Sequence, residues 1–280
     1  MKLHTINTGY FKLDGGAMFG VVPKTMWQKL NAPDEKNLCT WAMRCLLIED
    51  GKQLILIDTG LGNKQDEKFF SHYEPHGEDT LSKSLNALGF SPDDITDVLL
   101  SHLHFDHCGG AIERNKDGQL VPAFKQATYW SNKDHWKWAT EPNAREKASF
   151  LKDNILPIEQ SGQLKFAEAN STTIHPDILL KTASGHTDAM FIPHIKVGGK
   201  TIVYCADLFP SMAHIPLPYV MAYDTRPLLT LEEKKVLLEE AVVNDYFLFF
   251  EHDKAVECCS LQQTERGVRE KDAMKLAELF

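Results

Sequence analysis

The densest group of chemically active side chains lies in residues 101–110, SHLHFDHCGG. It places His102, His104, Asp106 and His107 within six positions, directly after the apolar run DVLLS. With 12 histidines in 280 residues, the pattern H-x-H-x-D-H arises by chance in roughly one such chain per thousand. Alternate residues of an extended segment point the same way, so His102 and His104 can share one metal ion. The following loop turns Asp106 and His107 toward a second position. Imidazole and carboxylate are ligands that divalent zinc and related ions accept, which indicates a metal site.

Three further candidate ligands follow apolar runs elsewhere in the chain. His186 follows ILLKTA, Asp207 directly follows TIVYCA, and His252 directly follows YFLFFE. Strands that end in ligands at one edge of a sheet build a shared site, and this repetition argues against histidines that only cap neighbouring strands. Seven such side chains suffice for two metal ions that share a carboxylate. The predicted ligands are His102, His104, Asp106, His107, His186, Asp207 and His252.

Short apolar and β-branched runs bounded by glycine, aspartate or histidine predict buried strands along the chain. They cover residues 41–49, 53–58, 97–101, 178–183, 190–197, 201–206 and 246–251. Leucine spacing predicts a helix over 79–88, and Thr230 with Glu233 forms a capping-box pattern for a helix running to about Asn244. Residues 141–154 and 271–280 are also predicted to be helical. Strands and helices interspersed in this way predict an α/β protein with layered sheets.

Length and composition narrow the class of protein. The 280 residues carry 30 Lys and Arg against 39 Asp and Glu, a formal net charge of −9 at pH 7. This acidic balance, without any basic run, argues against nucleic acid as a partner. No linker or short repeat interrupts the chain, so we expect a single domain over residues 1–280. The six cysteines form no C-x-x-C pair, the first residues lack the apolar stretch of a signal peptide, and no run is long enough to span a membrane. We therefore expect a cytoplasmic protein.

The ligand pattern resembles that of the metallo-β-lactamase superfamily of hydrolases, from the first strands through His252. The resemblance implies a four-layer αββα sandwich, in which two mixed β-sheets pack face to face with helices on both outer sides. Asp58 in the IDTG segment matches the family's aspartate at a strand end and would orient a ligating histidine, the alternative being a plain turn aspartate. The resemblance further implies one metal ion on His102, His104 and His186, a second on Asp106, His107 and His252, and Asp207 bridging the two.

Within the superfamily, this chain most resembles the N-acyl-homoserine lactonases, whose signature is nearly SHLHFDHCGG. Residues 13–27 and 206–224 are similar to the YtnP-type branch of that group. The resemblance implies an enzyme with two divalent transition-metal ions that opens the lactone ring by attack of a metal-bridging hydroxide. Asp106 or Asp207 would accept and pass on the proton. Zn²⁺ is the expected metal, while a ligand set without thiolate also admits Fe, Mn or Co.

Other activities use the same architecture and stay open at this point. Methyl-parathion hydrolases and aryl esterases share much of the pattern, so a carboxylesterase or phosphotriesterase on the same two metals is the alternative. Sulfur dioxygenases of this fold use a single iron and are not excluded by the ligands alone. An alternative from another class is a metal-binding protein that has lost catalysis, which the complete set of seven ligands opposes. The expected partner is a small lactone or ester, and no membrane surface is expected.

The segment after Asp207 departs from the lactonase pattern. Some lactonases carry a catalytic tyrosine three residues after the bridging aspartate, and that position is Pro210 here. Tyr223, or else Tyr219, would then reach the site from the following loop and donate to the leaving oxygen, unless both only pack in a proline-rich loop. His214 in the same loop is either a substrate contact or a satisfied polar group.

Apolar and aromatic segments outside the ligand pattern suggest further surfaces. Residues 16–22 (GAMFGVV) with Trp27 would roof an acyl-chain pocket, form the interface of a homodimer or pack in the core. His135 is expected at the surface rather than at a metal. Some of the aromatic side chains around it are expected to be exposed at a pocket wall or a partner surface, namely Trp130, Trp136 and Trp138.

Overall fold

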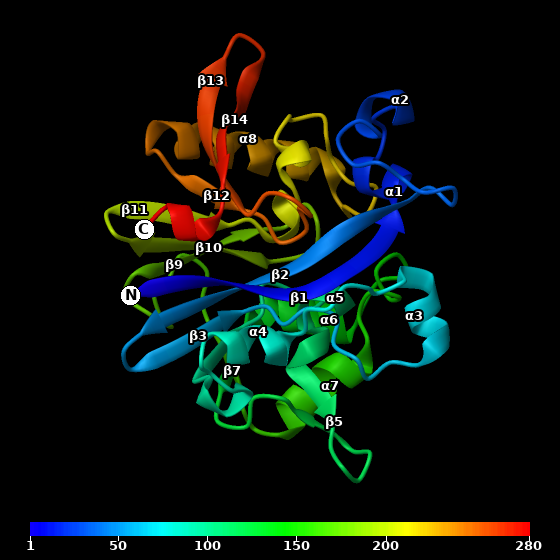
Figure 1. The fold of residues 1–280 in the computed structure, drawn as a ribbon, viewed down its shortest axis with the longest axis vertical. Helices are drawn as coiled ribbons and strands as arrows, with labels where there is room; N and C mark the ends of the chain where they lie inside the picture. The colour runs from blue at the N-terminus through cyan, green and yellow to red at the C-terminus, as the bar shows by residue number, and fades with distance from the viewer.

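The computed structural model describes residues 1–280 and contains two six-stranded β-sheets packed face to face (Figure 1). Both sheets are mixed, because parallel pairs such as β3–β4 and β11–β12 stand beside antiparallel ones. In spatial order, the first sheet contains β1 (Lys2–Asp14), β2 (Leu38–Asp50), β3 (Gln53–Ile57), β4 (Asp97–Leu99), β7 (Thr128–Ser131) and β8 (Leu164–Phe166). The second contains β14 (Gly267–Met274), β13 (Cys258–Thr264), β12 (Phe247–Phe249), β11 (Lys200–Tyr204), β10 (Met190–Val197) and β9 (Ile178–Ala183). A separate small hairpin pairs β5 (Ile112–Arg114) with β6 (Leu120–Pro122).

The alternation of side chains along the strands places the core between the two sheets. In β2, Leu46 and Ile48 belong to the apolar core between the sheets, whereas Cys45 and Leu47 belong to the cluster on the opposite face. Successive side chains of a strand point to opposite faces, so a strand that is apolar throughout must be covered on both sides. This explains why the first sheet needs helices on its outer face.

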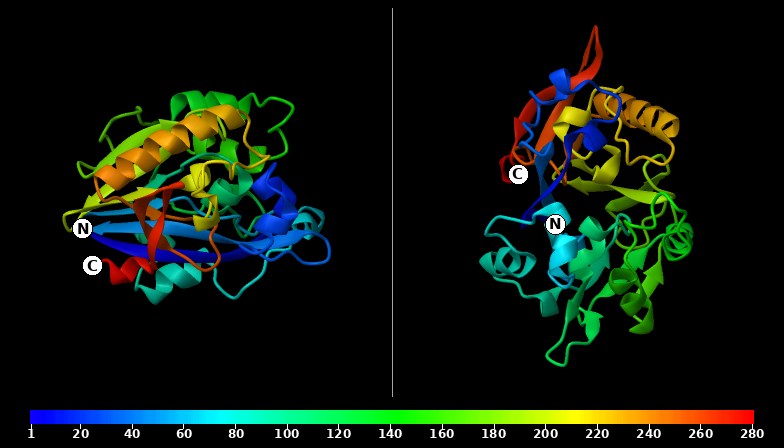
Figure 2. Two further views of the ribbon diagram at one scale, coloured as in Figure 1. Left: turned by 90° about the horizontal axis from the view of Figure 1, so that it is seen from above. Right: turned by 90° about the vertical axis from the view of Figure 1, so that its right-hand side faces the viewer.

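Helices supply that outer cover on both sides (Figures 1 and 2). Leu85 of α4, Trp136 of α6 and Ile155 of α7 pack in the outer cluster of the first sheet, while α8 contacts β13 and β14 of the second. The four-layer αββα sandwich is thereby confirmed. The helices are α1 (Gly15–Phe19), α2 (Lys24–Trp27), α3 (Glu67–Tyr73), α4 (Leu81–Ala87), α5 (Phe105–Cys108), α6 (Lys133–Thr140), α7 (Lys152–Gln160) and α8 (Pro227–Val243).

The predicted strands are confirmed, two of them with the predicted bounds. Residues 178–183 and 190–197 form β9 and β10, and the other predicted runs lie in or overlap β2, β3, β4, β11 and β12. The sequence pattern did not predict β1, whose register shifts between Asn7 and Tyr10, around Gly9 with a φ of 105°. A bulge of this kind breaks the two-residue periodicity from which strands are recognised.

The helix predicted over 79–88 is confirmed as α4, where the hydroxyl of Thr80 accepts from the N–H of Lys83 (3.2 Å). The helix predicted over 141–154 is wrong, because α6 ends at Thr140 and α7 begins at Lys152. Pro142 explains the break, since the residue before a proline is disfavoured in helical conformation and Glu141 has φ −121° and ψ 58°. Residues 141–151 form turns and short loops instead.

Two further helix predictions need correction. Residues 271–280 contain the second half of β14 and a short 3₁₀ turn, because pairing with β13 overrides their helical propensity. The helix predicted to run to about Asn244 is confirmed as α8, which ends at Val243, but the capping box at Thr230 is wrong. α8 begins at Pro227, and Thr230 lies buried in its first turn. The carboxylate of Glu233 accepts instead from the backbone N–H groups of Ser184 and Gly185 (2.7 and 2.9 Å).

The remaining features of the fold concern the chain ends, one hairpin, the cysteines and the character of the helices. The N- and C-termini lie close together, and the β13–β14 hairpin projects from the body of the protein (Figures 1 and 2). The six cysteines are buried and unpaired. None of the helices has the length and apolar character that crossing a membrane requires.

Candidate metal centre

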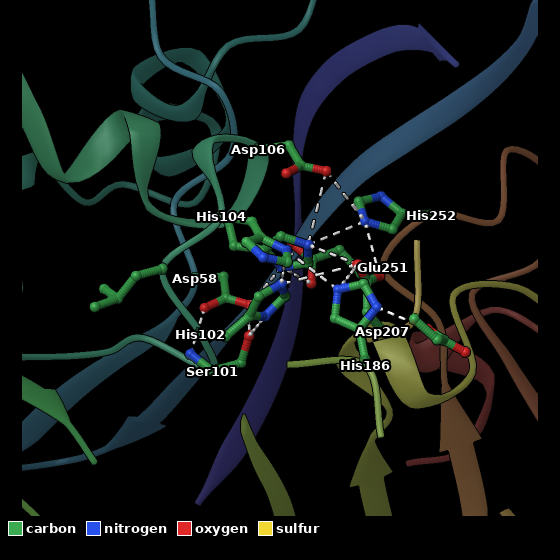
Figure 3. Close-up of polar contacts among 12 residues, drawn as sticks. Asp58, Ser101, His102, His104, Asp106, His186, Asp207, Glu251 and His252 are labelled. Carbon is green, nitrogen blue, oxygen red and sulfur yellow. Dashed lines mark hydrogen bonds and ion pairs between the residues drawn. The ribbon is translucent and has the colours of Figure 1, made fainter. Parts of the chain in front are cut away.

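The seven predicted ligands meet at one edge of the sheets, where four strands end (Figure 3). β4 leads into His102 and His104, and the one-turn helix α5 then turns Asp106 and His107 inward. β9, β11 and β12 lead to the remaining three, and all seven side chains are buried. The structure therefore brings together every residue of the predicted set, in the two groups that the resemblance implied.

The first group is a triangle of imidazole nitrogens. Nδ1 of His104 lies 3.1 Å from Nε2 of His102 and 3.1 Å from Nε2 of His186. Oδ2 of Asp207 lies 3.0 Å from the same nitrogen of His186. Four potential ligand atoms thus face a common centre.

The second group lies beside the first and shares Asp207 with it. Nε2 of His107 and Nε2 of His252 are 3.2 Å apart, and Oδ2 of Asp106 is 3.7 and 3.6 Å from them. Oδ1 of Asp207 lies 3.2 Å from Nε2 of His252. Oδ2 of Asp207 contacts His186 of the first group and also lies 3.6 Å from Nε2 of His107, so this one carboxylate faces both groups.

The protons of these histidines are held on the outer nitrogens. Nδ1 of His252 donates to the carbonyl of Ala42 (2.7 Å), and Nδ1 of His186 donates to Oδ1 of Asp224 (2.9 Å). Nδ1 of His102 lies 3.1 Å from the hydroxyl of Ser101, whose own proton goes to Asp58. A carbonyl or carboxylate only accepts, so in the neutral ring the outer nitrogen carries the hydrogen and the inner nitrogen presents a lone pair.

His107 is oriented by two buried carboxylates. Its Nδ1 lies 2.9 Å from Oε2 of Glu251 and 3.2 Å from Oδ2 of Asp58, and the hydroxyl of Tyr204 donates to Glu251 (2.7 Å). Asp58 thus contacts a predicted ligand, as an orienting aspartate requires, and is not a plain turn residue. Burial raises the pKa of Glu251 to about 7. Asp58 also accepts from the backbone N–H of Ser101 (2.7 Å), which fixes the start of the ligand segment.

Divalent cations fit this arrangement. Inner lone pairs that face one another at 3.1–3.2 Å repel unless a positive charge lies among them. Oδ1 of Asp207 and Nε2 of His104 are buried without a hydrogen-bond partner. Five imidazoles and two carboxylates without thiolate are the donor set that zinc and its neighbours accept.

The electrostatics of the site point the same way. Burial opposes ionisation of Asp207, yet His186, His252 and His107 hold its pKa well below the usual value. Burial also lowers the pKa of His102 well below its usual range. For His186, the carboxylates of Asp207 and Asp224 outweigh burial and raise the pKa to about 10. The centre thus attracts positive charge, from a proton or from a cation.

Above the metal centre lies a cavity of about 260 Å³. Tyr223 lines it together with Asp106 and Asp207, whereas Tyr219 does not line it and packs against Phe19. A second phenol, Tyr73 of α3, lines the cavity and was not predicted. The apolar part of its wall is formed by Leu13, Met18, Phe105 and Met221.

His214 is a satisfied polar group and not a substrate contact. Its Nε2 donates to the carbonyl of Met18 (2.9 Å), its Nδ1 accepts from the hydroxyl of Ser211 (2.7 Å), and its ring stacks on Phe19. The apolar segment 16–22 has mixed roles. Met18 lines the cavity and Trp27 is buried, so roof and core are both found.

The predicted exposure around His135 is wrong. His135 is 1% exposed, accepts from the N–H of Leu103 (2.8 Å) and donates to the carbonyl of Asp188 (2.6 Å). It therefore ties the segment of His102 to the segment of His186. Trp136 of α6 is buried because this helix packs on the first sheet, and Trp130 and Trp138 are half-buried.

Sequence reasoning also missed the residues that surround the ligands. Glu251 had a signal, because a charged residue directly before His252 at the end of an apolar run is unusual. Asp224 and Glu146 carried none, since their partners His186 and His104 lie far away in the sequence.

Comparison with known sequences finds one family and several related enzymes that are similar to this chain. The profile described as the metallo-beta-lactamase superfamily matches residues 44–250. An N-acyl homoserine lactonase from Bacillus thuringiensis is 26% identical over 230 residues, which cover 78% of this chain and 82% of that protein. An N-acyl homoserine lactonase from Bacillus cereus has the same identity and coverage.

Solved structures share the whole fold, and the profile match identifies the family. A probable metal-dependent hydrolase from Staphylococcus aureus superposes with a TM-score of 0.88 at 29% identity, covering 98% of this chain and 96% of that one. AidC, described as a dizinc quorum-quenching lactonase, superposes with a TM-score of 0.77 at 24% identity, covering 98% of this chain and 95% of that one. At this identity the likeness shows the fold alone. With a profile match over more than half of its length and this site, the chain belongs to the metallo-β-lactamase superfamily and is a metal-dependent hydrolase.

Proposed function

We propose that this hydrolase opens the lactone ring of N-acyl-homoserine lactones at a two-metal site. The observation that carries the proposal is Asp207, whose carboxylate faces both groups of imidazole nitrogens at a cavity with an apolar wall. The names of the relatives at 26% identity support this choice of substrate.

The residues present would hold two cations. One would be held by His102, His104 and His186, the other by Asp106, His107 and His252, with Asp207 between them. Zn²⁺ is the proposed metal, with Fe, Mn or Co as alternatives. When bound, such a pair polarises a carbonyl oxygen and lowers the pKa of water toward neutrality.

The carboxylates of the chain would handle the proton. Asp106 and Asp207 both reach the place where the two groups meet, within 3.7 Å of Nε2 of His107. In the proposed reaction, one of them accepts the proton of the attacking water and passes it toward the leaving oxygen. The surrounding histidines hold the pKa of Asp207 well below the usual value, against the effect of burial, so this carboxylate is ionised at neutral pH.

Tyr223 is the proposed relay for this proton: its phenol donates to the ring oxygen that leaves and regains a proton from the carboxylate that accepted one from the water. Its side chain lines the cavity and is 39% exposed. Burial raises its pKa above the usual value, so the phenol keeps a proton to donate at neutral pH. The apolar residues Leu13, Met18 and Met221 would receive the acyl chain and exclude water from the reacting carbonyl.

Three further proposals concern the whole chain. We propose that residues 1–280 form a single domain and that the protein works in the cytoplasm. We also propose a homodimer through the N-terminal apolar segment, where Val21 and Met26 are 94% and 51% exposed.

The test compares kcat/KM for N-hexanoyl-homoserine lactone, an aryl ester and a phosphotriester, with zinc-loaded and chelated protein. The proposal expects a preference for the lactone of about 100-fold or more, lost on chelation. A preference for the aryl ester or the phosphotriester would show that the substrate is of that class and not a lactone. Bound zinc with no turnover of any of the three would favour a binding protein.

A further inference from the structure

The segment 141–151 brings one buried carboxylate against the metal centre. Glu146 is 3% exposed, although its neighbours Arg145 and Lys147 are exposed. The segment is attached beside His104, because the N–H of Phe105 donates to the carbonyl of Ser149 (3.0 Å). A carboxylate buried in this position needs a partner that repays its loss of hydration.

The carboxylate of Glu146 is held in one orientation. Nε1 of Trp138 and Nδ2 of Asn143 both donate to its Oε2, at 2.7 and 2.6 Å. The other oxygen, Oε1, is buried and has no hydrogen-bond partner. Nε2 of His104 lies 3.5 Å from this oxygen.

His104 differs from the other four histidines of the site. It turns Nδ1 toward the shared centre, whereas the other four turn Nε2 toward theirs. Its outer nitrogen is therefore Nε2, which is buried and has no hydrogen-bond partner within ordinary distance. The other histidines have a carbonyl, a carboxylate or a hydroxyl at the outer nitrogen, at 2.7–3.1 Å.

We propose that Glu146 is a positioning residue for the metal centre, which keeps the hydrogen of His104 on Nε2 and so leaves the lone pair of Nδ1 free for a cation. The proposal rests on the proposed metal role of His104 and not on the choice of substrate. The hydrogen bonds that Oε2 receives from Trp138 and Asn143 support it, because they leave Oε1, an acceptor, as the atom that faces His104.

The structure makes an unusual prediction for the isosteric variant Glu146→Gln. Trp138 and Asn143 are both donors, so they select the amide oxygen of the new side chain. The amide NH₂ then points at His104 and donates to Nε2, which moves the histidine hydrogen to Nδ1. Glu146→Ala leaves only a gap that water can fill, and water accepts from Nε2–H.

The experiment measures zinc affinity by competition with a chromophoric chelator for the wild type, Glu146→Gln, Glu146→Ala and the control Glu141→Gln. Glu141 is exposed in the same segment. We expect Glu146→Gln to lower the affinity for one of the two zinc ions by about 10- to 100-fold. Glu146→Ala should lower it less, and the control should bind zinc as the wild type does. A purely structural role predicts the opposite order, because glutamine preserves volume and packing.

A second measurement needs no variant. In the long-range ¹H–¹⁵N spectrum of the zinc-loaded wild type, we expect His104 to carry its hydrogen on Nε2. A hydrogen on Nδ1, or Glu146→Ala binding zinc more weakly than Glu146→Gln, would overturn the inference alone. A wild type that binds no zinc would overturn the proposed function as well.

Discussion

Two regions enclose the cavity, and they are held in different ways. The floor consists of the seven residues His102, His104, Asp106, His107, His186, Asp207 and His252. These follow the ends of strands, and the outer ring nitrogen of each histidine faces an acceptor. Besides Leu13, Met18, Tyr73 and Phe105, the rest of the lining comes from two loop segments, 141–151 and 209–226, which contain no strand and are called the wall here.

A few long polar side chains hold the wall. Arg145 donates to the carbonyls of Ala222 and Asp224, which joins the two wall segments. Nζ of Lys234, fully buried in α8, donates to the carbonyls of Pro216, Leu217 and Tyr219. Metal chemistry therefore belongs to the part fixed by the sheets, while substrate choice belongs to the wall, whose residues Asp224 and Glu146 also contact the ligands His186 and His104.

The largest effect is expected at the floor. Asp207→Ala removes the one carboxylate that faces both groups, so we expect activity to fall by about 10³-fold or more and metal content to fall below that of the wild type. Elemental analysis and steady-state kinetics measure this, with circular dichroism to verify folding. Asp177→Ala, at an exposed position, is the control. Full turnover in a folded Asp207→Ala protein would contradict the two-metal account.

The next effect tests whether the wall takes part in chemistry. Tyr223→Phe keeps the ring in the cavity but removes the proposed proton donor, so we expect kcat to fall by about 10²-fold with metal content unchanged. Tyr219→Phe is the matched control, because Tyr219 does not line the cavity. Equal kcat values for the two variants would show that the wall only binds substrate.

Loosening the wall should weaken substrate binding without changing the metal content. Lys234→Met leaves three carbonyls without their buried donor, so we expect a loss of about 2 kcal/mol in unfolding free energy and a raised KM. Metal content and kcat should stay close to the wild type, because no floor residue contacts Lys234. Denaturant unfolding and kinetics provide the readouts, with the exposed Lys235→Met as control. A loss of metal in Lys234→Met would show that loosening segment 209–226 also displaces the ligands.

The smallest effect concerns pH. Burial lowers the pKa of His214 from 6.5 to about 3. Between these values the unfolded chain binds a proton that the folded protein does not, so His214 makes stability fall as pH falls from about 6.5. We expect His214→Gln to reduce the slope of unfolding free energy against pH by at most about 1.4 kcal/mol per pH unit. Above pH 7 the slopes of variant and wild type should be equal. Unfolding free energies from pH 4 to 8 test this, with the exposed His76→Gln as control. An unchanged slope would show that His214 is charged within the wall.

The floor was predictable because its signal is local. Each ligand stands next to an apolar run, and such runs become strands whose ends meet at one edge of a sheet. β9 and β10 have the predicted bounds, and the groups formed by His186 and His252 are those expected. Tyr223 reaches the cavity as expected, although Pro210 stands where some lactonases have their tyrosine.

The wall and its supports were not predictable, because their contacts join distant parts of the chain. Residues 141–151 have a helical composition, yet Pro142 ends α6 and frees Glu146 to reach His104. His135 is read as a surface residue from its polar neighbours, but its ring bridges Leu103 and Asp188, 32 and 53 positions away. No periodicity records such a bridge, since it depends on how the first sheet and the loop after β9 come together.

The most direct test of the account is a zinc titration of metal-free protein while ring opening of N-hexanoyl-homoserine lactone is followed by mass detection of the acid. The two groups of ligands that share Asp207 predict that activity rises until two equivalents of zinc are bound and then stays constant. Full activity at one equivalent, or ring opening by the metal-free protein, would contradict the account.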